Sequence, residues 1–86
     1  MQFEGAVIKE QGQTFAVVIV KPSVLDSNTE REKARNGVSR YFRGMPLILM
    51  AQSNNGVPTY HGRSDIAKFL ASIDFRLIPW ERYTLQ

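Results

Sequence analysis

Two short runs of apolar residues constrain the fold of this chain most strongly. Residues 14–21 and residues 47–51 are each apolar on both faces of an extended strand, a pattern that is typical of strands covered on both sides. Between them, Ser27 and Glu30 have the spacing of a capping box, in which both side chains bond free amides at the start of a helix. Two buried strands joined by one helix form a right-handed crossover, so the sequence predicts that they lie parallel in one sheet.

The first central strand is preceded by another extended run. Residues 3–10 read as a strand, and the glycine-containing turn at 11–13 predicts a hairpin with residues 14–21. Pro22 ends the second arm of this hairpin, because proline cannot donate to the strand ladder.

The second central strand is followed by a similar arm. The turn signal at residues 53–56 predicts that residues 57–61 return beside 47–51, and Pro58 restricts this arm to the edge of the sheet. Ser64 is placed to cap a last helix. Its apolar stripe has helical spacing and consists of Ile66, Phe69, Leu70 and Ile73.

These elements predict a single α+β domain over residues 1–86. The expected order is ββαββα, with a mixed sheet in which 14–21 and 47–51 are the parallel central strands and an antiparallel hairpin lies on either side. A chain of 86 residues is too short for a second independent core.

The first helix carries an apolar stripe that includes a glycine. Residues at helical spacing in this segment are Ala34, Gly37, Val38, Tyr41 and Phe42. We expect Gly37 to be a close-packing glycine and Tyr41 and Phe42 to point into the core. In the alternative interpretation, Asn36 and Gly37 end the helix early.

The C-terminal segment, residues 74–86, is too apolar for a disordered end, so we expect it to dock on the domain. Aromatic residues and arginines lie close together there, as they do in protein interfaces. The predicted interface residues are Arg76, Trp80, Arg82, Tyr83 and Leu85. They serve either a protein partner or self-association; the alternative is that the segment completes the small core.

The net charge of +3 permits contact with nucleic acid. Candidate contacts with a single strand are the cationic residues in and after the first helix, Arg31, Lys33, Arg35, Arg40 and Arg43. The alternative is an ordinary solvated helix face, because Glu30 and Glu32 alternate with these cations.

Residues that could carry chemistry are few. The chain has no cysteine, which excludes disulfides, thiolate nucleophiles and thiolate metal sites and fits a cytoplasmic location. His61 is the only histidine, and its spacing to Ser64 and Asp65 does not favour a hydrolytic triad. Gly44 and Gly62 belong to no phosphate-binding loop. We therefore expect no catalytic residues, no metal site and no cofactor.

The strand, helix, strand, strand, helix order of residues 15–73 resembles the C-terminal half of thioredoxin-like domains. The residues that carry the resemblance are Gly44, Pro46, Asn55, Gly56 and Gly62. In that family the proline is cis and faces a pair of redox cysteines, which this chain lacks, so the resemblance implies a shape and no activity. The chain also resembles short uncharacterised bacterial proteins that end in a similar Ile-Pro-Trp segment.

The leading hypothesis for function is a non-enzymatic protein-interaction or accessory module. The alternatives are weak binding of single-stranded nucleic acid by the basic first helix and, last, a small-molecule enzyme.

Overall fold

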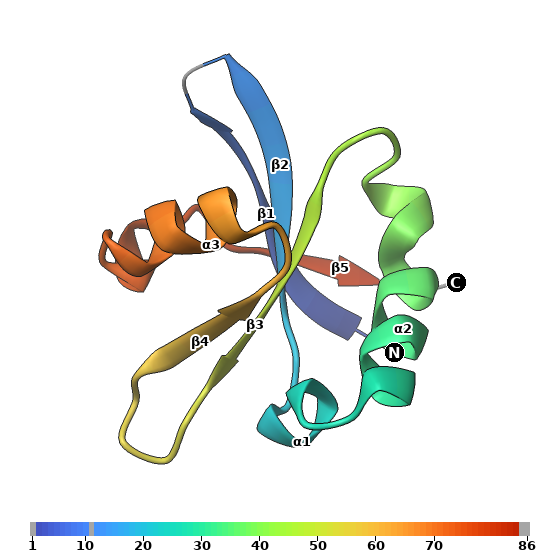
Figure 1. Ribbon diagram of the computed structural model, residues 1–86. Coiled ribbons are helices and arrows are strands. Elements are labelled where there is room, and N and C mark those ends of the chain that lie inside the picture. The colour runs from blue at the N-terminus through green and yellow to red at the C-terminus, as the bar shows by residue number, and fades with distance from the viewer. Residues whose placement is uncertain (1, 11, 85–86) are drawn as a thin grey trace.

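The structure is a computed structural model that describes residues 2–10 and 12–84. Its centre is a five-stranded mixed sheet in the order β4-β3-β2-β1-β5. Helix α2 packs on one face of this sheet and helix α3 on the other (Figure 1). The strands are β1 (Gln2–Glu10), β2 (Gln13–Ile19), β3 (Leu47–Gln52), β4 (Pro58–His61) and β5 (Glu81–Thr84). The helices are α1 (Pro22–Leu25), α2 (Asn28–Val38), the 3₁₀ turn η1 (Ser39–Tyr41), α3 (Ser64–Ala71) and the 3₁₀ turn η2 (Phe75–Leu77).

The centre of the sheet confirms the fold predicted from the two apolar runs. Strand β2 is parallel to β3, with Val17 beside Ile48 and Val18 beside Leu49. These four side chains are almost fully buried, because each face of the central pair is covered by a helix. β1 and β4 flank the pair in antiparallel orientation, and β4, which begins at Pro58, forms one edge.

Two apolar clusters hold the layers together. On the α3 side, Ile66 and Leu70 of the helix pack with Phe15, Ile48 and Met50 of the sheet. On the α2 side, the buried side chains are Ala16, Val18, Val38, Phe42 and Leu49. The alternation of each strand therefore divides its residues between two cores.

The ends of the helices agree only in part with the sequence. Ser27 caps α2 as predicted, since its Oγ accepts a hydrogen bond of 3.3 Å from the amide of Glu30. The helix continues through Gly37 to Val38, so the early ending is wrong. The cap predicted at Ser64 is also wrong: Ser64 is the first helical residue of α3, Arg63 precedes it, and no side chain caps this helix.

The role predicted for Gly37 is wrong as well. A β-carbon placed at Gly37 would have no atom within 4 Å outside its own helix backbone and chain neighbours. None of the residues that the structure describes therefore packs closely against this glycine. The stripe position that it occupies faces open space, whereas Val38 beside it is buried.

Besides the 3₁₀ turns η1 and η2, two elements are additional to the expected ββαββα order. Pro22 begins the one-turn helix α1 after β2 has ended at Ile19. At the other end of the chain, β5 pairs antiparallel with the first residues of β1, Gln2–Gly5, and forms the second edge of the sheet. Figure 1 shows this strand behind the central pair, on the opposite side of the sheet from β4.

Candidate functional site: a groove beside helix α2

A groove of about 360 Å³ lies between α2 and the sheet. Its walls are mainly apolar, with contributions from Phe3, Val18, Val20, Val24, Ala34 and Val38. These residues come from the start of β1, the end of β2 and the two helices that follow it. This volume is within the range of sites that bind ligands or anchor side chains, roughly 300 to 1,000 Å³.

Gly37 forms part of the wall that α2 contributes. Glycine inside a helix costs about 1 kcal/mol relative to alanine. Its backbone needs no left-handed conformation here, and no neighbour requires the close approach that glycine allows. A side chain at residue 37 would fill part of the groove, so the glycine keeps the groove open.

Two lysines border the groove. Lys21 follows β2 and Lys33 lies on α2, four residues before Gly37, and both are exposed. Within the described ranges, neither ammonium group makes an ion pair. The rim therefore carries two positive charges that a bound anionic group would meet.

The groove continues around the end of the sheet into a second hollow of about 490 Å³. Phe3, Val20 and Lys21 line both spaces. The far wall of the second hollow carries Glu4 and Arg82, whose charged groups are 3.7 Å apart.

The five candidate nucleic-acid residues do not share one face. Arg31 donates to the carbonyl of Leu25 and, at 3.3 Å, to Oδ1 of Asn28, so it joins α2 to α1. Lys33 instead borders the groove. Arg40 lies over the ring of Tyr41, 5.0 Å from its centre, and Arg43 is exposed in the loop before β3.

Arg35 fastens α2 to the sheet. Its guanidinium donates to the carbonyl oxygens of Leu47 and His61, the latter at 3.0 Å, and also lies 3.1 Å from Nδ1 of His61. Burial lowers the pKa of Arg35 from its usual value, with a further lowering by Arg31 and an opposite effect of Glu32. Arg35 is thus part of the fold rather than an open contact site.

The residues considered for hydrolysis are engaged separately. Nδ1 of His61 faces Arg35, and desolvation, followed by the charges of Arg31 and Arg35, lowers the pKa of His61. The carboxylate of Asp65 accepts two hydrogen bonds from Arg63, at 3.1 and 2.6 Å, which lower its pKa. Asp65 is therefore paired with Arg63 and does not orient His61 as a triad would require.

The predicted interface residues divide into packed aromatics and exposed arginines. Trp80 is half-buried, and its Nε1 donates to the carbonyl of Phe75 at 3.1 Å. Tyr83 stacks on Phe3 with ring centres 4.9 Å apart. Arg76 and Arg82 are exposed and lie beside Asp74 and Glu4, respectively. Leu85 lies outside the described residues.

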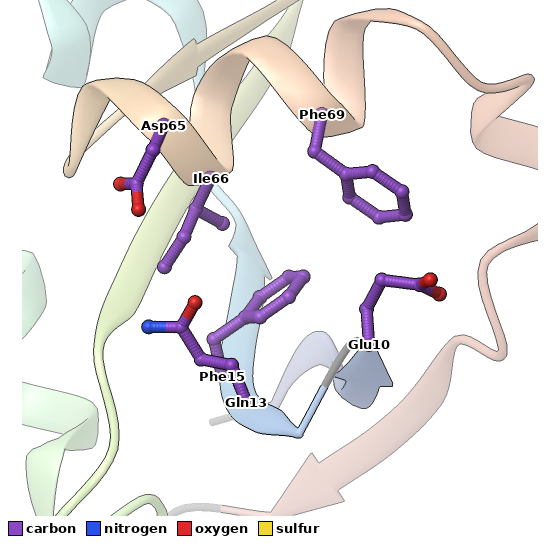
Figure 2. Close-up of a pocket in the computed structure, with 6 residues that line it drawn as sticks. All are labelled: Glu10, Gln13, Phe15, Asp65, Ile66 and Phe69. Atoms are coloured by element: carbon purple, nitrogen blue, oxygen red, sulfur yellow. The ribbon is translucent and has the colours of Figure 1, made fainter.

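A smaller hollow of about 170 Å³ separates the β1–β2 hairpin from α3 (Figure 2). Glu10 and Asp65 lie on opposite sides of it, with the rings of Phe15 and Phe69 between them. Phe15 and Phe69 pack edge to face at 6.3 Å. Of the two carboxylates at this hollow, Asp65 is already paired with Arg63 at 2.6 Å.

Comparisons with known proteins give no relative: no family model, no curated protein and no solved structure matches this chain. Among residues 2–10 and 12–84, no three histidine, cysteine, aspartate or glutamate side chains are grouped as a metal ion would require. The same part of the chain contains no helix long and apolar enough to cross a membrane.

Sequence reasoning identified Gly37 but not the groove. The signal was present in the sequence, since a glycine on the apolar stripe is followed by Val38 and preceded by Lys33 and Ala34. Helical spacing places Gly37 on the apolar side of the helix, but it does not show whether that position is tightly packed or lies open in a groove. The groove itself could therefore not be predicted from the spacing.

Proposed function

We propose that this protein is a non-enzymatic protein-interaction module that binds an acidic, amphipathic segment of a partner protein in the α2 groove. The observation that supports this proposal is the opening at Gly37. An apolar groove beside a helix, left open by a glycine and bordered by two lysines that form no ion pair with any described residue, is suited to the apolar side chains and carboxylates of such a segment.

The shape of the site favours a polypeptide as the occupant. The groove adjoins the second hollow, with which it shares Phe3, Val20 and Lys21, so one extended segment can contact both spaces. The lysines at its rim and the net charge of +3 favour acidic over basic partners and accelerate their association.

The test uses two peptides of the same length with leucines at helical spacing, one with glutamate and one with lysine at the polar positions. Each is titrated into the ¹⁵N-labelled protein while amide chemical shifts are recorded. We expect the acidic peptide to bind with a Kd between about 1 μM and about 1 mM and to shift the amides of Lys33, Ala34 and Gly37. We expect the basic peptide to bind at least about tenfold more weakly.

Gly37→Leu and Asn36→Leu form the matched pair of variants. Both add the same side chain to α2, but only residue 37 lines the groove, whereas Asn36 is exposed outside it. Gly37→Leu should weaken the acidic peptide at least about tenfold, and Asn36→Leu should leave its affinity unchanged.

Three results would overturn the proposal. One is equal affinity for the acidic and basic peptides, and another is an equal effect of the two leucine variants. The third is binding of sodium dodecanoate in the groove with no binding of the acidic peptide, because the site would then accept a small amphiphile and not a polypeptide.

Three sequence expectations remain proposals. We propose a cytoplasmic location, which the absence of cysteine supports. A distant relation of residues 15–73 to thioredoxin-like domains is supported by the parallel β2–β3 pair and antiparallel β4, although the bond before Pro46 is trans. Self-association through the C-terminal segment is supported only by its exposed arginines, Arg76 and Arg82, since its aromatic side chains pack within the domain.

A further inference from the structure

One edge of β1 is left open beyond β5. Strand β1 has nine residues, but β5 pairs only with Gln2–Gly5. The chain turns sharply before β5, where the amide of Trp80 donates to the carbonyl of Ile78 at 2.8 Å, so residues 78–80 do not extend the ladder. Among the described residues no other strand pairs with this side of β1, and the side chain of Val7 is 40% exposed.

The register fixes which backbone groups point outward. Glu10 and Gln13 are partners in the β1–β2 ladder with two residues between them in the chain, so they form a hydrogen-bonded pair. Pairs alternate along an antiparallel ladder, which directs the N–H and C=O groups of Ile8 toward β2. Those of Val7 and Lys9 therefore point away from the sheet, at the open edge.

Each of the other two edges carries one feature that hinders the addition of a further strand. Strand β4 begins with Pro58, which has no N–H to offer to a further strand. On β5, the carbonyl of Thr84 already accepts a hydrogen bond from the hydroxyl of Tyr41 at 3.1 Å. The segment of β1 from Val7 to Lys9 has no comparable cover, and it lies in the hairpin that projects from the sheet at the top of Figure 1.

We propose that this edge pairs with the same edge of a second copy of the chain. An antiparallel arrangement with a two-fold axis at Ile8 places Val7 of each copy opposite Lys9 of the other. This register satisfies the outward groups of both residues in both copies, because each Val7–Lys9 pair exchanges two backbone hydrogen bonds. It also lays each exposed valine against the aliphatic part of a lysine.

The paired segment is short, so the dimer is weak. Interfaces below about 1,200 Å² are typical of transient complexes. We therefore expect an equilibrium between monomer and dimer over protein concentrations from about 10 μM to about 1 mM, measured by sedimentation equilibrium. This expectation does not depend on the α2 groove, which lies at the other end of β1.

Val7→Lys and Val57→Lys are the matched variants. Both replace an exposed valine, 40% and 56% exposed respectively, and both add one charge to the chain. Only Val7→Lys places an ammonium group opposite Lys9 of the second copy, so it should weaken association at least about tenfold. Val57→Lys should associate as the unmodified protein does.

Two further measurements keep the test decisive if Val7→Lys loses its fold. Val7→Pro removes an N–H that β2 does not use, and should abolish the dimer while leaving the circular dichroism spectrum unchanged. In the unmodified protein, hydrogen exchange of the Val7 and Lys9 amides should slow as the protein concentration rises. A monomer at about 1 mM, or a dimer that is insensitive to all changes at Val7, would overturn the proposal.

Discussion

At the scale of single residues, Gly37 lowers the stability of α2 but keeps the α2 groove open. The glycine is in the interior of α2, and its missing side chain would meet no atom within 4 Å. The helix therefore bears the conformational cost of glycine, and the groove remains open.

Replacing this glycine by alanine should stabilise the protein. Gly37→Ala should raise the free energy of unfolding by about 1 kcal/mol, since alanine favours the helix and the added methyl group meets no obstacle. For a domain of this size, that increase corresponds to a rise in Tm of about 4 to 8 °C, which a thermal melt would detect. A lower Tm would show that the position is packed in solution, contrary to the structure.

His61 gives the protein a defined response to pH. Burial and the nearby Arg31 and Arg35 lower its pKa in the folded state below the ordinary 6.5. Above that value the histidine is neutral in both states and has no effect. As the pH falls through 6.5, the unfolded chain takes up the proton more readily, so the free energy of unfolding decreases until the folded state is protonated as well.

The variant His61→Asn should remove this dependence, because asparagine keeps an acceptor for Arg35 but does not titrate. Urea unfolding at intervals from about pH 7.5 to about pH 5 measures the change. The unmodified protein should lose stability over this range by more than the variant does. Equal slopes for the two proteins would show that His61 is not perturbed.

At the scale of elements, β5 belongs to the fold as an edge strand. It covers the start of β1 and places Tyr83 on Phe3, while Trp80 packs against the cluster beneath α3. The aromatic residues of the C-terminal segment thereby close the sheet at the side opposite β4.

Deleting residues 79–86 should lower the free energy of unfolding by a few kcal/mol. The deletion exposes Phe3 and removes the burial of two aromatic side chains, each worth about 1.5 to 3 kcal/mol. Urea unfolding measures the loss, and sedimentation distinguishes the cause. An unfolded monomer indicates that the segment completes the core, whereas folded monomers from a parent dimer would indicate an interface. A truncated chain with unchanged Tm and association would contradict both roles.

The elements that the sequence predicted are those with strong local signals. The runs at β2 and β3 could be recognised because residues 15–18 and 48–51 within them are all buried, and Ser27 could be recognised because capping depends on local spacing. Strand β5 could not be recognised, because Glu81 and Arg82 are charged and exposed and the strand exists only through its pairing with β1. Helix α1 is a single turn, too short for any helical period to appear.

The candidate site was harder to predict because neighbouring residues of α2 have different surroundings in the fold. Lys33, Arg35 and Gly37 are close in the sequence but take three different positions: the groove rim, the carbonyls of Leu47 and His61, and the open wall of the groove. Spacing alone grouped the cations into one surface. Only the contacts of α2 with α1 and with the sheet show that Arg31 and Arg35, respectively, are used within the domain.

At the scale of the whole molecule, the cationic residues in and after α2 lie in different surroundings. This distribution predicts weak binding of nucleic acid. With two arginines engaged by backbone carbonyls and Arg40 lying over Tyr41, the cations in and after α2 form no continuous stripe within the described part of the chain. We expect no Kd below about 100 μM for mixed-sequence single-stranded oligonucleotides at low salt, measured by fluorescence anisotropy. Tighter binding with a steep salt dependence would instead support the nucleic-acid alternative.

The pairing of β5 with β1 has a consequence for the order in which the protein is made. Gln2 lies beside Thr84, so the edge of the sheet joins residues that leave the ribosome at very different times. Of the five strands of this sheet, β1 is made before the others, and its Phe3 lacks the ring of Tyr83 until residues 81–84 emerge. During that interval the nascent chain exposes an apolar strand edge, which is the kind of surface that chaperones bind and that seeds aggregation when synthesis is interrupted.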